Sequence, residues 1–146
     1  MSNVSPLNNR VHHMPYLNLN LSSSASPEAI DKIADILTDL TASVLGKKRE
    51  LTAVAVNLTQ PQHWYIGATA LAGQQFSSFY LEIKVTEGTN TKNEKASYVS
   101  QVFAALSEIV GPLAPASYIV IHEVHADAWG YEGQTQEFRY IRGKAL

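Results

Sequence analysis

The chain has 146 residues and a mass of 16.0 kDa, with 45% hydrophobic and 16% charged residues. These values are typical of a single folded domain with a sizeable core, and they exclude a disordered polymer. The net charge is −2, and no block of basic residues is present to neutralise phosphates, so we expect no nucleic-acid partner.

The sequence contains no cysteine, which excludes disulfides, zinc–thiolate sites and thiol catalysis. The first twenty residues lack the apolar core of a signal peptide. No apolar run approaches the roughly 20 residues that a membrane-spanning helix needs. We therefore expect a cytoplasmic protein with no membrane partner.

The N-terminal residues divide into an arm and the start of a domain. Residues 1–13 are polar, carry only Arg10 as a fixed charge and show no periodicity. We expect them to form an arm outside a single domain that spans residues 14–146. After Met14, the run "PYLNLNL" alternates between leucine and polar residues, which predicts a strand buried on one face.

The first predicted helix has clear start and stop signals. Ser26 is suited to the N-cap, Pro27 to the first helical position and Glu28 to the first turn. Apolar residues keep helical spacing up to Gly46, which is suited to the C-terminal stop. After the basic turn "KKRE", the run "LTAVAVNL" at 51–58 predicts a second strand.

A second strand–helix–strand unit follows the loop-like residues 59–76. The alternating run "SFYLEIKV" predicts a strand, and Thr91 with Glu94 resembles a capping box at the start of a helix. "GP" at 111–112 ends this helix, and "SYIVIHEV" predicts the fourth strand. The polar tail that begins at Tyr131 leaves open whether a further short strand is present.

The doubled pattern predicts the architecture. Each unit is a βαβ, whose two strands run parallel with a right-handed crossover. Two such units make an α/β (α+β) fold with a four-stranded mixed sheet and both helices on one face. Because the strands are rich in leucine and valine, we expect self-association to cover the other face.

Pro15 raises a chemical question, because it directly follows Met14 where the first strand opens. An internal proline nitrogen is an amide and accepts no proton near neutral pH. An N-terminal proline nitrogen is a secondary amine. The pKa of an α-amino group is about 7.7–8.0, and burial beside cations lowers it, which suits a general base. A proline that merely opens a strand is the alternative.

The segment "HEVH" at 122–125 invites a metal interpretation. On a strand, Glu123 and His125 share a face, but the helical H-E-x-x-H pattern of zinc proteases is absent. We therefore predict no metal site.

Taken together, these features resemble the tautomerase superfamily, and most closely its macrophage migration inhibitory factor branch, with 4-oxalocrotonate tautomerase as a related type. The likeness extends from Met14 to about Gly133. It rests on the Met-Pro step, on the doubled βαβ pattern, and on the order and spacing of four segments. The first two segments are "LGKKRELTAVAVNL", which contains Lys47, and Ile66-Gly67-Ala68, which stands where the family has a Phe-Gly-Gly core. The last two are "SYIVIHEV", which contains Tyr118, and Asp127-Ala128-Trp129-Gly130.

The resemblance implies a fold, an assembly and a site. It implies a tautomerase-like homotrimer in which Pro15, freed of Met14, is the catalytic base of an isomerase that needs no cofactor. Lys47 would bind the carboxylate of a small 2-oxo acid or enol, and Tyr118 would reach into a neighbouring subunit's pocket. Lys48 and Arg49 are alternatives to Lys47.

Aromatic residues offer a further expectation about the pocket. Trp129, with Trp64 and Tyr65, could rim a pocket for an aromatic or apolar substrate. Packing between subunits is the alternative for these side chains.

The sequence departs from the family pattern at several points. Val120 replaces a usual asparagine, Glu87 falls where a pocket isoleucine is common, and the Cys-x-x-Cys of the human factor is absent. Thirteen residues also precede Met14. Two interpretations stay open: a tautomerase whose Pro15 is freed, or a non-catalytic trimeric binding or scaffold protein with Pro15 blocked. In the full chain we expect residues 10–14 to lie across the pocket near Lys47.

Overall fold

The computed structural model describes residues 14–138 and 141. It confirms the two βαβ units. The first consists of β1 (Tyr16–Leu21), α2 (Pro27–Leu45) and β2 (Ala53–Leu58), and the second of β5 (Phe79–Thr86), α3 (Lys92–Val110) and β6 (Tyr118–Val124).

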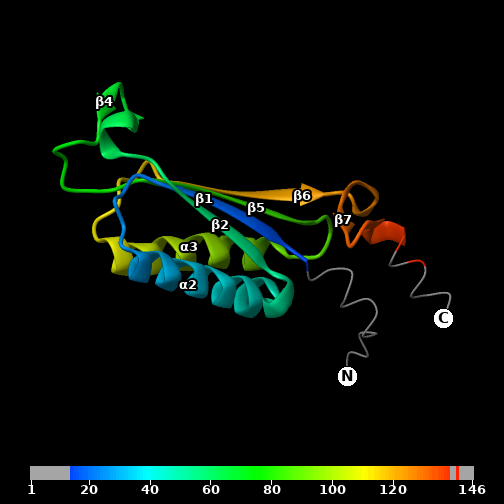
Figure 1. Ribbon diagram of the computed structural model, residues 1–146. Coiled ribbons are helices and arrows are strands. Elements are labelled where there is room, and N and C mark those ends of the chain that lie inside the picture. Colours follow the sequence, from blue (N-terminus) through cyan, green and yellow to red (C-terminus); the bar gives the residue numbers. More distant parts are fainter. Residues whose placement is uncertain (1–13, 139–140, 142–146) are drawn as a thin grey trace.

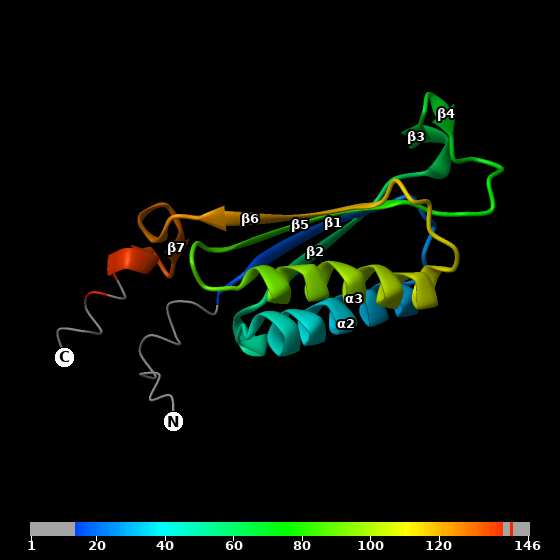
Figure 2. The same ribbon diagram turned by 180° about the vertical axis from the view of Figure 1, so that it is seen from behind.

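The four long strands form one mixed sheet in the order β2-β1-β5-β6. β1 pairs with β2 and β5 with β6 in parallel, whereas the two units meet through an antiparallel pairing of β1 with β5. Both helices lie side by side on one face of this sheet (Figures 1 and 2). The beginnings of β1 and β2 therefore share one end of the sheet with the last residues of β5 and β6, and this end holds the candidate site.

Local signals start and end the helices as expected. The Ser26 side chain accepts a hydrogen bond from the backbone N–H of Ala29 at the start of α2. Thr91 and Glu94 form a complete capping box at the start of α3. Gly46 ends α2 with φ of 69°, a left-handed conformation that glycine adopts without a steric cost.

The core lies between the sheet and the two helices. Alternate residues of β1 and β5 point toward the helices, and the helices add residues at helical spacing. All of these core residues lie between Leu17 and Leu106, so the core needs no residue that precedes Pro15. Its fully buried members are Leu17, Leu19, Leu21, Ile33, Leu37, Phe79, Leu81, Ile83, Tyr98, Val102 and Leu106.

The uncovered face of the sheet is more polar than the sequence suggested. The leucines and isoleucines of β1 and β5 face the helices, and the opposite face carries Asn18, Asn57, Glu82 and Lys84 together with tyrosines. The uncovered face is polar because alternation directs almost every aliphatic residue of β1 and β5 to the covered side.

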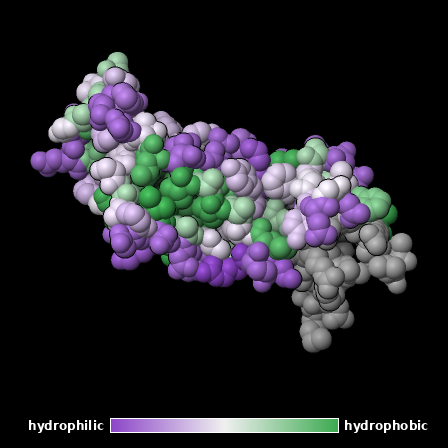
Figure 3. Space-filling view, viewed as in Figure 1, coloured by the Kyte–Doolittle hydropathy of each residue, from purple (hydrophilic) through white to green (hydrophobic). Residues whose placement is uncertain are grey.

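Apolar exposure is concentrated instead at the edge strand β2. Val54 and Val56 pack against the core but stay partly exposed, and Leu58 is 42% exposed. Figure 3 shows hydrophobic residues gathered in this region of the molecule, surrounded by hydrophilic ones. Within residues 14–138, the outer edge of β2 has no strand beside it.

Two hairpins extend from opposite ends of the sheet (Figure 1). β3 (Tyr65–Ile66) and β4 (Thr69–Ala70) form one hairpin, and β7 (Gly130–Tyr131) and β8 (Gln134–Thr135) form the other. The second hairpin answers the question of whether the polar tail contains a short strand.

Short 3-10 helices lie within three of the loops: η1 (Arg49–Leu51), η2 (Pro61–His63) and η3 (Ala126–Ala128). No helix in the described part of the chain combines the length and apolar character that crossing a bilayer requires.

Candidate active site

Pro15 lies immediately before β1, at the end of the sheet where β1 and β2 begin. Its side chain is buried. Its carbonyl oxygen accepts a hydrogen bond from the N–H of Ala53 at 3.3 Å, which starts the parallel ladder between β1 and β2. Because proline has no N–H to donate, the first position of a strand is suited to it. The position of the Pro15 nitrogen is thus set by the main sheet.

Met14 is buried beside the C-terminal hairpin, with 7% of its surface exposed. Its carbonyl oxygen accepts a hydrogen bond of 3.0 Å from the indole Nε1–H of Trp129. This carbonyl belongs to the peptide bond between Met14 and Pro15, and that bond makes the Pro15 nitrogen an amide without basicity. The hydrogen bond from Trp129 therefore stabilises the peptide bond that blocks Pro15. Of the residues predicted to cover the pocket, 10–13 lie outside the described residues.

Gln136 is a fully buried polar residue at the same place, and the sequence analysis did not identify it. Its Nε2 lies 3.6 Å from the sulfur of Met14, and its Oε1 has no hydrogen-bond partner among the described residues. Its backbone N–H donates to the carbonyl of Trp129 at 2.7 Å, which holds the backbones of these two residues next to each other. Glu132 and Gly133 form the turn of this hairpin with positive φ, and no local signal in the polar tail indicates the contact of Gln136.

Lys47 is buried just beyond the end of α2, with 5% exposure, and its Nζ donates a hydrogen bond of 2.8 Å to Oγ1 of Thr89. Burial lowers the pKa of Lys47 from 10.5 to about 8, although the negative charges of Glu94 and Glu123 partly oppose this shift. Thr89, Glu94 and Glu123 would therefore compete with a substrate carboxylate for the Lys47 ammonium.

The two alternatives to Lys47 differ from it. The Arg49 guanidinium lies 2.6 Å from a carboxylate oxygen of Asp35 and 3.4 Å from one of Asp39, both on α2. This exposed cluster holds Arg49 against the outside of the helix. Lys48 is exposed.

Tyr118 does not meet Pro15 within one chain. Its side chain is 62% exposed on the uncovered face of the sheet. The strand register aligns Tyr118 with Tyr80 and, through it, with Asn20 of β1, whereas Pro15 precedes Tyr16. From Pro15 to the level of Asn20 is five residues of a strand, which span about 16 Å. The distance from Pro15 is thus too large for one small substrate to contact both side chains in the same chain.

The aromatic rim is divided in the same way. Trp64 and Tyr65 belong to the β3–β4 end of the molecule, and Trp129 precedes β7 at the other end (Figure 1). Within one chain these three side chains therefore do not surround a single pocket, and their place in a pocket between subunits stays a prediction.

Glu123 and His125 of "HEVH" each have a partner of their own. Glu123 lies 2.7 Å from Nζ of Lys95, and His125 Nδ1 lies 2.8 Å from Glu87. Glu87 therefore pairs with a histidine at the position where the family often has a pocket isoleucine. Among the described residues, no group of three potential metal ligands comes together.

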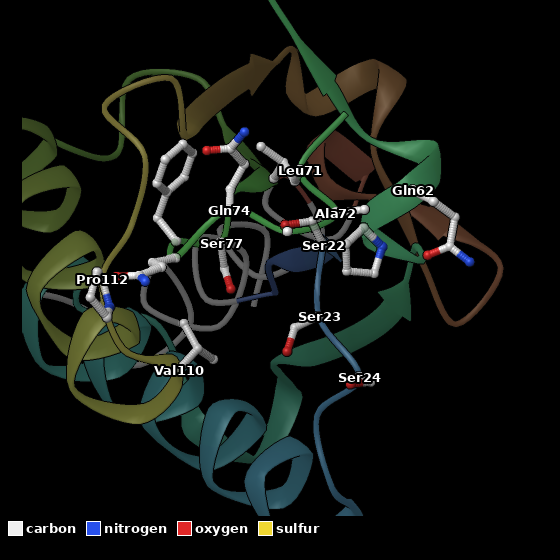
Figure 4. Close-up of a pocket in the computed structure, with 14 residues that line it drawn as sticks. Ser22, Ser23, Ser24, Gln62, Leu71, Ala72, Gln74, Ser77, Val110 and Pro112 are labelled. Carbon is white, nitrogen blue, oxygen red and sulfur yellow. The ribbon is translucent and has the colours of Figure 1, made fainter. Parts of the chain in front are cut away.

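A pocket of about 440 Å³ lies at the opposite end of the sheet from Pro15, between the loops that follow β1 and α3 and the loop before β5. Its lining is uncharged. Figure 4 shows the hydroxyl groups of Ser23 and Ser77 approaching it from different segments. The pocket offers hydrogen-bonding groups but no side chain that titrates near neutral pH, so it lacks a general base.

The sequence model of the tautomerase family, described as tautomerase enzyme, matches residues 80–139. This segment covers β5, α3, β6 and the C-terminal hairpin, and it includes Tyr118, Trp129 and Gln136 but neither Pro15 nor Lys47. No curated protein sequence matches the chain significantly.

Solved structures extend the likeness to both βαβ units. The macrophage migration inhibitory factor-like protein of Entamoeba histolytica superposes with a TM-score of 0.70 at 21% identity, covering 84% of this chain and 99% of that chain. A fused 4-OT, solved as a wild-type symmetric trimer, gives 0.74 at 15% identity, covering 84% and 96%.

A third structure is the macrophage migration inhibitory factor homologue of Prochlorococcus marinus, which gives a TM-score of 0.67 at 21% identity, covering 82% of this chain and 97% of that chain. The chain thus shares its fold with these three structures, and residues 80–139 match the sequence model of the tautomerase family. The hydrogen-bonded carbonyl of Met14 and the buried side chain of Gln136 are features of this site that no local sequence pattern indicates.

Proposed function

We propose that this protein is a keto–enol tautomerase of a small 2-oxo acid once its chain begins at Pro15. The observation that supports this most directly is the position of Pro15, which is buried directly before β1 at the end of the sheet where β1 and β2 begin. Removal of the residues up to Met14 turns the Pro15 amide into a secondary amine and frees the Trp129 N–H for a ligand.

The proposed reaction moves one proton. The Pro15 amine removes the hydroxyl proton of the enol and delivers a proton to the neighbouring carbon, while the C=C bond becomes a C–C bond and the C–O bond becomes C=O. No atom is gained or lost, and no cofactor is required. Buried surroundings and nearby cations favour the neutral amine, which is the form that acts as a base.

We assign the substrate carboxylate to Lys47 or to Trp129. Lys47 offers a positive charge at pH 7, because its pKa of about 8 leaves it mostly protonated. Binding there would replace the hydrogen bond to Thr89. Trp129 offers a neutral donor whose present acceptor, the Met14 carbonyl, leaves with the N-terminal residues.

A homotrimer completes the proposed site. The separation of Tyr118 from Pro15 within one chain fits a tyrosine that serves a neighbouring subunit. The partly exposed Val54 and Val56 and the exposed Leu58 of the edge strand β2 fit a subunit interface. The fused 4-OT structure is described as a trimer. A cytoplasmic location, with a small 2-oxo acid or enol as the partner and no nucleic-acid or membrane partner, remains a prediction.

The second candidate function is a non-catalytic trimeric binding or scaffold protein that keeps the full chain. The burial of Met14 and the hydrogen bond to its carbonyl favour this alternative, because both stabilise the blocked form.

Intact-mass measurement of the protein from its native host separates the two functions. A chain that begins at Pro15 supports the tautomerase. A chain that retains Met14 and the residues before it contradicts the tautomerase and supports the scaffold.

A further inference from the structure

Two side chains from the C-terminal segment converge on Met14. The indole N–H of Trp129 donates to its carbonyl oxygen at 3.0 Å, and Nε2 of Gln136 lies 3.6 Å from its sulfur. The backbone hydrogen bond from Gln136 to Trp129 holds the backbones of these two residues next to each other. When Met14 is removed, both groups therefore face the vacated volume next to the Pro15 nitrogen.

Gln136 is poorly satisfied while Met14 is present. Its side chain is fully buried, its Oε1 has no hydrogen-bond partner among the described residues, and its Nε2 faces a thioether sulfur, which is a weak acceptor. Buried amide groups without partners are rare and costly in folded proteins. A buried glutamine whose amide meets only a weak acceptor is thus a poor choice for stability, since a leucine or methionine would fill the same space.

We propose that Gln136 is a substrate-binding residue whose side-chain amide forms a hydrogen bond with the substrate oxygen that interconverts between ketone and enol. This inference rests on the proposed tautomerase function. It assigns a role within that function to a side chain that lies beside Met14 and has unused hydrogen-bonding capacity.

The chemistry of the two tautomers explains why a glutamine suits this position. The oxygen of an enol is a hydroxyl that donates a hydrogen bond, whereas the oxygen of a ketone only accepts. An amide side chain offers an acceptor, Oε1, and donors on Nε2. Gln136 can therefore form a hydrogen bond with the oxygen of either tautomer. The indole N–H of Trp129 is a donor only, so it suits an oxygen that accepts hydrogen bonds in both tautomers, such as a carboxylate oxygen.

A purely structural role for Gln136 makes a different prediction. If Gln136 only packs against its neighbours, the substitution Gln136→Met affects the stability of the full chain and of the chain that begins at Pro15 in the same direction. If Gln136 is a binding residue, Gln136→Met leaves the full chain as stable or more stable, because it replaces an unsatisfied amide with an apolar side chain of similar size.

The experiment uses the chain that begins at Pro15, which retains every residue of the described core. Ketonisation of phenylenolpyruvate gives kcat and KM, and calorimetry with phenylpyruvate, the keto form, gives affinity without turnover. Gln136→Met should lower kcat/KM at least about tenfold and weaken phenylpyruvate binding. The matched control is Gln134→Met in the adjacent strand β8, which should change neither.

The outcomes are distinguishable. Unchanged kcat/KM and unchanged phenylpyruvate affinity in Gln136→Met overturn the inference, as does an equal drop in melting temperature of both chain forms. If the chain that begins at Pro15 does not ketonise the enol, the proposed function fails. Calorimetry with phenylpyruvate then still tests the role of Gln136. That role is overturned if phenylpyruvate does not bind, or if Gln136→Met leaves its affinity unchanged. The role is retained if phenylpyruvate binds and Gln136→Met abolishes this binding.

Discussion

The indole N–H of Trp129 donates a 3.0 Å hydrogen bond to the carbonyl oxygen of Met14, 115 residues earlier in the chain. That carbonyl belongs to the peptide bond that keeps the Pro15 nitrogen from acting as a base. The C-terminal segment therefore stabilises the blocked form of the N-terminus. The same donor becomes available to a ligand when Met14 is absent.

This hydrogen bond predicts a stability change that depends on the length of the chain. Trp129→Phe removes the N–H donor and should destabilise the full chain by about 1 kcal/mol, because a partly buried carbonyl loses its partner. In the chain that begins at Pro15 that carbonyl is absent, so the destabilisation should disappear. Urea denaturation measures both effects, with Trp64→Phe as the control at the other end of the sheet. Equal losses in both chain forms would contradict the account.

Lys47 predicts a pH dependence of stability. Its folded-state pKa is lowered to about 8 from 10.5, because burial disfavours the charged form. Between these two values the unfolded chain binds a proton that the folded chain has lost, so stability rises with pH, by up to about 1.4 kcal/mol per unit. Below pH 8 the burial penalty is fully present and this contribution is flat.

Comparison with Lys47→Met isolates that contribution. Denaturation at pH 7 and at about pH 9.5 gives the free energy of unfolding of the unsubstituted chain and of Lys47→Met. The free energy of the unsubstituted chain, relative to that of Lys47→Met, should be higher at the higher pH. A difference that stays constant over this range would show that the Lys47 ammonium is not desolvated.

The first hairpin predicts a stabilising substitution. Gly67 and Ala68 form its two-residue turn with φ of 57° and 65°, and alanine in this left-handed region carries a steric cost that glycine avoids. Ala68→Gly should raise the free energy of unfolding by about 1 kcal/mol. Ala70→Gly in the adjacent strand β4 is the control and should lower it. Destabilisation by Ala68→Gly would show that the turn does not carry this strain.

Self-association gives a prediction for the uncovered sheet face. The protein should sediment at three times its 16.0 kDa chain mass at micromolar concentration. Ala55 lies in the edge strand β2, between the inward-facing Val54 and Val56, so Ala55→Arg should shift the mass toward the monomer. Ser100→Arg on the exposed side of α3 is the control. A monomer for the unsubstituted chain would contradict the proposed trimer.

Much of the fold could be predicted because its signals are local. The Ser26–Pro27 and Thr91–Glu94 pairs mark helix starts within four residues, and the alternating leucines of β1 indicate which face is buried. The β7–β8 hairpin was less clear, because its strands have two residues each and depend on the Glu132–Gly133 turn.

The candidate site could be predicted only in part, because its contacts join distant segments. Lys47 bonds to Thr89, 42 residues later, and Gln136 contacts Met14 across 122 residues. No spacing rule encodes such pairs. Gln136 also lacked a local signal, since a glutamine in a polar tail is ordinarily an exposed residue.

The rate of enol ketonisation by two forms of the protein tests the central claim most directly. Phenylenolpyruvate is given to the full chain and to the chain that begins at Pro15, under identical conditions, with Pro15→Ala in the shorter form as the matched variant. We predict activity in the shorter chain, a strong reduction in Pro15→Ala, and little or no activity in the full chain, whose Pro15 nitrogen is an amide. Equal rates in both forms, unaffected by Pro15→Ala but lost in Lys47→Ala, would show that a different base carries the reaction.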